Sequence, residues 1–278
     1  MENYNSNPFS FGPRPGELDN LGNNLRPLNH DVLYTLNNSI SAANLRLWRA
    51  TCRIADRTAS HALTLRYHAA LLPFVKNPSD FRNILRLTCS VISGSIALHV
   101  LDIDRASTWT PTDLDIYTPN YSAIQIISYL CKIEGYNIVD HPDHYSFPAG
   151  GYDCIFHLRR GNSHIDVIQS NTRSALQPIP YFWATHVMNY LTSDSFCIAY
   201  PDLTLDGKSL LNPIHLIDRL HPSTTVIHNI HKYSERGYTF RTRPTAWAND
   251  TTAPCNDPAA CPRTTCPTTS VIRTIGGQ

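Results

Sequence analysis

Three aspartates stand in segments that otherwise have the apolar pattern of buried strands. Asp113 and Asp115 lie two residues apart in TDLDIYTP, and Asp166 lies in HIDVIQ. Side chains at positions i and i+2 of a strand point to the same face of a sheet, so the first two carboxylates should be neighbours. If the strand over 164–169 pairs beside the strand over 113–117, all three carboxylates meet, and a bound divalent cation would offset their repulsion. The sequence therefore predicts a site for Mg²⁺ or Mn²⁺, both of which accept oxygen ligands.

A Gly-Ser pair precedes these acids in the apolar run VISGSIAL, where a strand gives way to a helix. Backbone N–H groups at a helix start point outward, and glycine lets an anion approach closely. We expect Gly94 and Ser95 to bind the phosphates of a nucleotide, with an N-cap role as the alternative for Ser95. Tyr117 is a candidate to stack on a base, or else a core residue. Lys208 and Lys232 are candidate phosphate partners, or else exposed lysines.

The elements that must position these residues follow from the hydrophobic patterning. Alternating strand patterns are interleaved with amphipathic helices, which predicts an α+β fold in which a mixed β-sheet carries flanking helices. Ser79 is the expected N-cap of a helix before the first strand. A further helix is expected to end near Gly237. The predicted strands cover 89–93, 113–117, 136–139, 152–158 and 164–169, the last two joined by a hairpin turn in RRGNS.

The chain of 278 residues divides by composition into four parts. Its ends are rich in Pro and in polar residues without periodicity, which predicts disorder. Three tail cysteines, Cys255, Cys261 and Cys266, leave a zinc site open as an alternative to a loose tail. The expected parts are a disordered leader over 1–26, a helical region over 27–78, a core over 79–243 and a Pro/Thr/Cys-rich tail over 244–278.

The motifs together resemble the nucleotidyltransferase superfamily. Its signature is an apolar residue with Gly-Ser, then Asp-x-Asp beyond a helix, then a third acid on a later strand. In this sequence the matching residues are Gly94, Ser95, Asp113, Asp115 and Asp166. The resemblance implies that the three acids are catalytic metal ligands. It also implies transfer of a nucleotidyl group from a nucleoside triphosphate to a hydroxyl of a protein, an RNA or a small molecule.

A narrower resemblance covers about residues 60–240. The segments FRNILRLTCSVISGSIAL, DLDIY, THVMNYLT and HKYSERGYTF are similar to those of an uncharacterised branch of mushroom-fungus proteins with a nucleotidyltransferase-like core. The segment between Ser95 and Asp113 is longer than in compact members of the superfamily. It either covers the nucleotide or marks a site that has drifted. His186 and Asn189, in THVMNYLT, either pack in the core or face the nucleotide.

The helical region resembles a degenerate F-box, the module that docks on the linker subunit of a ubiquitin ligase. The usual Leu-Pro start is replaced by Leu28-Asn29, whereas LWRATCR fits better. The contact candidates are Leu28, Val32, Leu45 and Leu47; alternatively, these helices simply pack on the core. This opens a second hypothesis, in which the chain is a non-catalytic adaptor or recognition protein built on the same fold.

Composition bounds both hypotheses. The formal charge of +1 gives no overall field that would attract nucleic acid or an anionic membrane. No apolar run has the length of a membrane span, and the N-terminus has no secretory pattern. We therefore expect an intracellular protein, cytoplasmic or nuclear, whose eight cysteines are mostly reduced.

Overall fold

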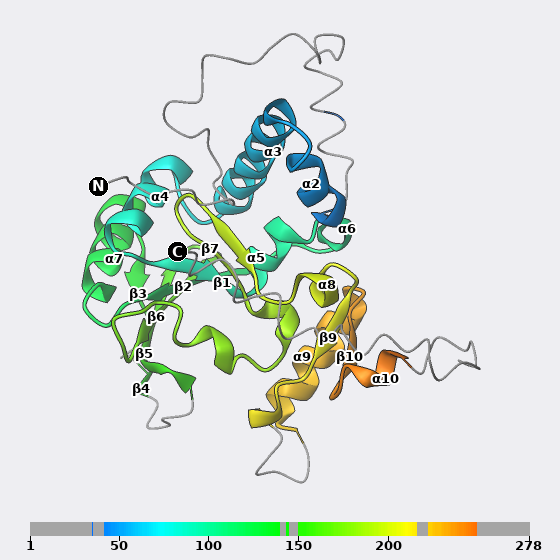
Figure 1. The fold of residues 1–278 in the computed structure, drawn as a ribbon. Helices are drawn as coiled ribbons and strands as arrows, with labels where there is room; N and C mark the ends of the chain where they lie inside the picture. The colour runs from blue at the N-terminus through cyan, green and yellow to red at the C-terminus, as the bar shows by residue number, and fades with distance from the viewer. Residues whose placement is uncertain (1–34, 36–41, 140–142, 145–149, 216–221, 249–278) are drawn as a thin grey trace, which may run out of the picture.

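A mixed β-sheet runs through the computed structural model, which describes residues 35, 42–139, 143–144, 150–215 and 222–248 (Figure 1). The strand order is β3-β5-β6-β2-β1-β7-β8, with β4 paired on β5. The β2–β6 pair is parallel and the other pairs of this sheet are antiparallel. The expected α+β class with a mixed sheet is confirmed. The strands are β1 (Val91–Ser93), β2 (Asp113–Thr118), β3 (Asn137–Ile138), β4 (Asp143–His144), β5 (Tyr152–Arg160), β6 (Ser163–Ser170), β7 (Asn189–Leu191) and β8 (Phe196–Ile198).

Helices precede and interrupt this sheet. The longest described helix, α3, ends two residues before Pro73, as expected from the missing N–H of proline. The amphipathic segment over 120–136 forms α7, which passes into a π-helical turn that closes at Gly135 with φ of 83°. The helices are α2 (Ala42–Arg49), α3 (Arg53–Leu71), α4 (Pro78–Leu87), α5 (Gly94–Leu101), α6 (Ile103–Ala106), α7 (Ala123–Tyr129), α8 (Pro201–Thr204), α9 (Thr224–Glu235) and α10 (Thr245–Ala248).

One face of the sheet forms the main hydrophobic core. Leu114 and Ile116 alternate with the acids of β2, and Ile165 and Val167 do the same on β6, so all four point away from the carboxylates and are fully buried. Burial of each such side chain contributes about 1.5–3 kcal/mol. The side chains that cover this face come from α3, α4, α5 and α7, and include Leu63, Tyr67, Phe81, Leu85, Ile96, Val100, Ile126 and Ile127.

The opposite face of the sheet has an apolar part and an acidic part, at different ends of β2 and β6. Toward the ends of β2 and β6 it carries a small apolar cluster, in which Tyr117 and Ile168 pack against Ala175 and Ile179 from the following loop. Toward the starts of the same strands it carries Asp113, Asp115 and Asp166. The acids therefore occupy the part of this face that the apolar cluster leaves uncovered.

A C-terminal unit packs beside the sheet. The strands β9 (Lys208–Leu210) and β10 (Thr239–Arg241) form a parallel pair, and α9 connects to β10 through Gly237. Figure 1 shows these elements grouped together in yellow and orange. A third apolar cluster, with Leu98, Val187, Tyr233 and Tyr238 at its centre, joins the unit to α5 and to the segment before β7.

The expected N-cap at Ser79 needs correction. Asn77, not Ser79, caps α4: its Oδ1 accepts from the N–H groups of Ser79 (3.0 Å) and Asp80 (3.3 Å). Proline favours the first helical turn, so Pro78 fixes the start two residues earlier than predicted. The apolar segment 181–191 ends in β7, after the 3-10 turns Ile179–Tyr181 and Thr185–Val187.

The helical region packs on the core, as one of its two interpretations required. Leu45 is 3% exposed and joins the main apolar cluster, so it is not a surface contact, whereas Leu47 is 68% exposed. Leu28, Val32, the leader over 1–26 and nearly all of the tail, with Cys255, Cys261 and Cys266, lie outside the described residues. Within the described part of the chain, no helix is both long enough and apolar enough to span a membrane.

Candidate active site

The register of the central strands brings the predicted acids together. In the parallel β2–β6 pair, Asp115 lies directly beside Asp166, and Asp113 lies beside His164. On the other side of β2, Ser93 of β1 lies beside Asp115. Paired residues of adjacent strands share a face, so all three carboxylates lie on the same side of the sheet, next to the end of β1.

The Gly-Ser turn closes over Asp115. Gly94 has φ of +67°, a conformation that favours glycine, and a Cβ at this position would lie 2.4 Å from Oδ2 of Asp115. The backbone can approach the carboxylate this closely only without a side chain. Ser95 is 7% exposed, and its hydroxyl donates to Oδ1 of Asp113 at 3.4 Å. The N-cap alternative for Ser95 is wrong, because Ser93 occupies that position and its hydroxyl donates to the carbonyl of Asn189 at 2.5 Å.

The pKa of Asp115 is raised by its surroundings. Burial, reinforced by the charges of Asp113 and Asp166, holds the pKa of Asp115 well above its ordinary value. Lys232 of α9 acts in the opposite direction. A group of carboxylates that repel each other in this way is favourable for a cation, since the ion removes the repulsion. Asp113, Asp115 and Asp166 thus stay the predicted ligands for Mg²⁺ or Mn²⁺. The described ligand atoms that all lie within 4.8 Å of one another are those of His157, His164 and Asp166.

Two histidines that the sequence interpretation did not include contact the third acid. His157 Nδ1 lies 2.7 Å from Oδ1 of Asp166, and His164 Nε2 lies 3.0 Å from the same oxygen. His157 is paired with Asp166 across the β5–β6 hairpin. The signal was present in the sequence: a two-residue turn at Gly161-Asn162 places residue 160 opposite 163, and hence 157 opposite 166. His164 shares a strand face with Asp166 by the same i, i+2 rule that paired the first two acids.

The remaining nucleotide-binding candidates take other positions. Tyr117 is 8% exposed and its ring lies 5.5 Å from that of Phe182, so it is the core residue of the alternative interpretation and not a base-stacking surface. Lys208 lies on β9, and its Nζ is 3.3 Å from Oδ2 of Asp206. Lys232, not Lys208, is the lysine whose charge lowers the pKa of Asp115 against the larger effects of burial and of the other acids.

His186 and Asn189 are fully buried and belong to the core. The backbone N–H of His186 donates to the hydroxyl of Ser209, and Nδ1 of the same residue lies 2.8 Å from that oxygen. Burial, with Arg236 nearby, lowers the pKa of His186 to about 3, so its ring is neutral at physiological pH. The nucleotide-facing alternative for these two residues is wrong.

The long segment between Ser95 and Asp113 anchors the C-terminal unit. Asp102 is 1% exposed; it accepts from Arg105 Nη1 at 3.1 Å and from the hydroxyl of Tyr238. Arg105 also donates to the carbonyls of Leu205 and Gly237. The segment thus holds β9 and β10 against α5.

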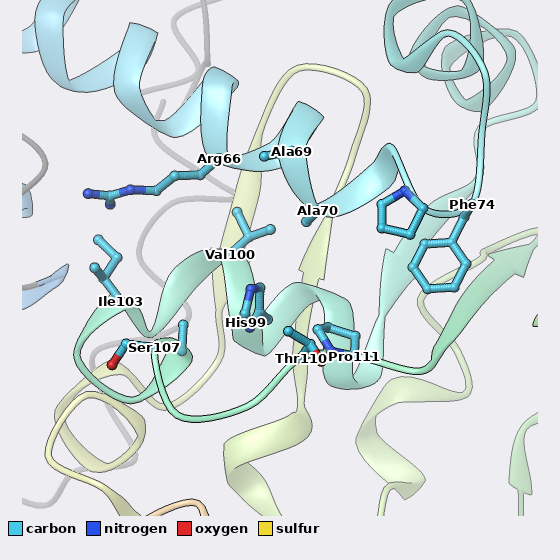
Figure 2. A pocket seen from close by; sticks show the side chains of 12 residues that line it. Arg66, Ala69, Ala70, Phe74, His99, Val100, Ile103, Ser107, Thr110 and Pro111 are labelled. Carbon is cyan, nitrogen blue, oxygen red and sulfur yellow. The ribbon is translucent and has the colours of Figure 1, made fainter. Parts of the chain in front are cut away.

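A separate pocket of about 420 Å³ lies between α3 and the end of α5, where the long segment begins (Figure 2). Its lining is mainly apolar, with Ala69, Ala70 and Val100 on the helices and Pro111 at the rim. His99 is a partly buried polar side chain of this lining, and its burial lowers the pKa of the imidazole. The acids are not among its lining residues.

Comparisons of the chain with known protein families, with curated proteins and with solved structures find no match.

Proposed function

We propose that this chain is a metal-dependent nucleotidyltransferase, which moves a nucleoside monophosphate from a nucleoside triphosphate to a hydroxyl and releases pyrophosphate. One observation carries the proposal: Asp113, Asp115 and Asp166 share a face of the sheet beside the Gly94–Ser95 turn. The resemblance to the nucleotidyltransferase superfamily, which rests on these same five residues, is part of the proposal. So is the resemblance to its mushroom-fungus branch, which rests on longer segments over about residues 60–240.

The three carboxylates have two roles in this proposal, cation binding and acceptance of a proton. Asp113 and Asp115 hold the cation, and Asp166 contributes to the same site. Both histidine contacts of Asp166 fall on Oδ1, and no other described residue hydrogen-bonds its Oδ2. That oxygen is therefore the atom assigned to accept the proton of the attacking hydroxyl. Mg²⁺ or Mn²⁺, when bound, supplies the positive charge that stabilises the phosphate oxygens in the transition state.

The start of α5 receives the phosphates. The Ser95 hydroxyl, which donates to Asp113 in the structure, can turn to a phosphate oxygen once the carboxylate is engaged elsewhere. The backbone at Gly94 has no side chain to block the approach of an anion. Lys232 of α9 adds a positive charge that acts on Asp115. The assay identifies the nucleobase of the triphosphate and the hydroxyl that accepts the transferred group.

The test is incubation of the full chain with each labelled nucleoside triphosphate and Mg²⁺ or Mn²⁺, followed by a search for label on protein, RNA and small hydroxyl compounds. Asp113→Asn should abolish any transfer. Asp202→Asn, which changes an exposed acid on α8, is the matched control and should retain it. The absence of transfer with every nucleotide, together with the absence of Mg²⁺ binding, would reject the proposal.

The adaptor hypothesis receives less support. Of its four contact candidates, Leu45 is buried inside the chain, and Leu47 is the exposed one among those that the structure describes. A docking surface needs several apolar side chains at its centre. Co-purification with a ubiquitin-ligase linker subunit, lost in Leu47→Asp, would restore it.

A further inference from the structure

Two histidines and one carboxylate form a second cluster of metal-ligand type beside the acid pair. His157 Nδ1, His164 Nε2 and an oxygen of Asp166 all lie within 4.8 Å of one another. Each comes from the middle of the β5–β6 hairpin, whose paired backbone fixes their spacing. All three side chains are partly exposed, at 27%, 33% and 21% for His157, His164 and Asp166, so an ion can reach them from solvent.

The distances are slightly shorter than those that a bound ion requires. Two ligand bonds of about 2.1 Å at tetrahedral or octahedral angles place the ligand atoms about 3.0–3.4 Å apart. The two nitrogen–oxygen distances in the cluster are 2.7 Å and 3.0 Å. The imidazole rings are near parallel, with an interplanar angle of 28° and centroids 5.9 Å apart, so that both present a nitrogen to the same oxygen. Small rotations of the two rings would open the cluster to ligand spacing.

We infer that His157, His164 and Asp166 form a binding site for a first-row ion that accepts imidazole nitrogen, such as Zn²⁺ or Co²⁺, distinct from the Mg²⁺-type site of Asp113 and Asp115. Imidazole nitrogen suits these ions, whereas Mg²⁺ prefers oxygen ligands and retains its water. Three protein ligands leave at least one position for water or for a substrate oxygen.

The histidine site lies next to Asp113 and Asp115, because the register of β2 and β6 makes their residues neighbours. His164 lies beside Asp113, and Asp166 lies beside Asp115, on the parallel pair β2–β6. Asp166 thus has one oxygen toward the histidines and a second available to the acid pair. The inference goes beyond the proposed transfer, because the histidines would bind the ion whether or not a nucleotidyl group is moved.

The test uses the full chain, stripped of metal by a chelator and titrated with Co²⁺ alone, whose visible absorption reports nitrogen and oxygen coordination. We expect one saturable Co²⁺ site that Zn²⁺ displaces. His157→Ala and His164→Ala should each weaken Co²⁺ binding by at least about 10-fold. His61→Ala, which removes an exposed histidine of α3, should leave the affinity unchanged.

Asp113→Asn separates the two sites and should leave the Co²⁺ affinity within about threefold of wild type, since it keeps all three proposed ligands. Absence of saturable Co²⁺ binding by the wild type would overturn the inference. So would Co²⁺ binding that survives both histidine variants or is lost only in Asp113→Asn. If an alanine variant does not fold by circular dichroism, His157→Gln and His164→Gln replace it. Intact Co²⁺ binding without any transfer of label would reject the proposed function and leave this site standing.

Discussion

The buried His186 should make the stability of this protein fall as the pH is lowered. Its ring lies among aromatic side chains, 4.5 Å from Tyr233 and 4.7 Å from Tyr238 between centroids, and Nε2 has no hydrogen-bond partner among the described residues. Burial lowers the pKa of His186 in the folded protein from 6.5 to about 3. Protons therefore bind the unfolded chain at a higher pH than they bind the folded protein.

The size of the effect follows from these two values. A histidine with a depressed folded pKa contributes its full stability above the unfolded pKa and loses it as the pH falls toward the folded pKa. At pH 5 nearly every unfolded chain carries this proton and almost no folded molecule does, which costs about 2 kcal/mol relative to pH 8. At pH 4 the loss rises to about 3 kcal/mol. Asp115 works in the opposite direction, because its raised pKa favours the folded protein as the pH falls.

Comparison of variants isolates the contribution of His186. His186→Phe keeps a ring in the aromatic cluster but cannot titrate, whereas Ser209→Ala removes the hydroxyl that contacts Nδ1 and leaves the imidazole in place. The assay is urea unfolding followed by tryptophan fluorescence between about pH 8 and pH 5. The wild type and Ser209→Ala should each lose about 2 kcal/mol more than His186→Phe over this range. The same pH slope in His186→Phe and in the wild type would refute the reasoning, since every other titrating group is shared.

Three further predictions concern the acids and their supports. Gly94→Ala should abolish Mg²⁺ binding in calorimetry, because its Cβ would meet Asp115 Oδ2 at 2.4 Å. Gly161 also has a positive φ, of +55°, but a Cβ there would meet nothing within 4 Å. Gly161→Ala should therefore lower the free energy of unfolding by only about 1 kcal/mol and leave Mg²⁺ binding intact. Equal losses of Mg²⁺ binding in Gly94→Ala and Gly161→Ala would contradict this prediction. Asp115→Asn should raise the melting temperature in chelator, since it removes a carboxylate whose pKa is held high by like charges, and a lower melting temperature would count against that repulsion. Arg105→Ala should lower the free energy of unfolding in urea by about 3 kcal/mol by leaving Asp102 buried without its ion pair, and a loss below about 1 kcal/mol would show that Tyr238 suffices.

The acid site could be predicted because its signals are local. Apolar residues alternate with Asp113 and Asp115 on one strand and flank Asp166 on another, so strand type and face follow from short stretches of sequence. The glycine conformation follows from a strand that turns into a helix at Gly94. The parallel pairing of β2 with β6 was a condition of the prediction, and the structure satisfies it.

The remaining parts of the site could not be predicted because they depend on distant contacts. The charge of Lys232 acts on Asp115 only because α9 packs back through Tyr233 and Tyr238 onto α5. Lys208 and Lys232 were both candidate phosphate partners, and nothing in the local sequence pattern distinguishes one from the other. Tyr117 was a candidate to stack on a nucleobase, with a core position as the alternative. The core position follows from its neighbours Val91 and Ile168 on the same face of the sheet, which make that end of the face apolar.

A chain of buried hydrogen bonds connects the Gly94 turn to the C-terminal unit. The hydroxyl of Ser93 donates to the carbonyl of Asn189, whose side-chain amide donates to the carbonyl of His186 at 2.7 Å, and His186 contacts Ser209 on β9. Each of these four residues is fully buried, so none can exchange its partner for water without cost. The backbone that is proposed to receive the phosphates is therefore fixed to the same unit that carries Lys232. The backbone carbonyl and N–H of His186 keep their bonds to Asn189 and Ser209 whatever the charge of the ring. Protonation of the buried ring would instead place a charge among the aromatic side chains between the turn and the C-terminal unit, so acid should weaken the packing that holds the two together.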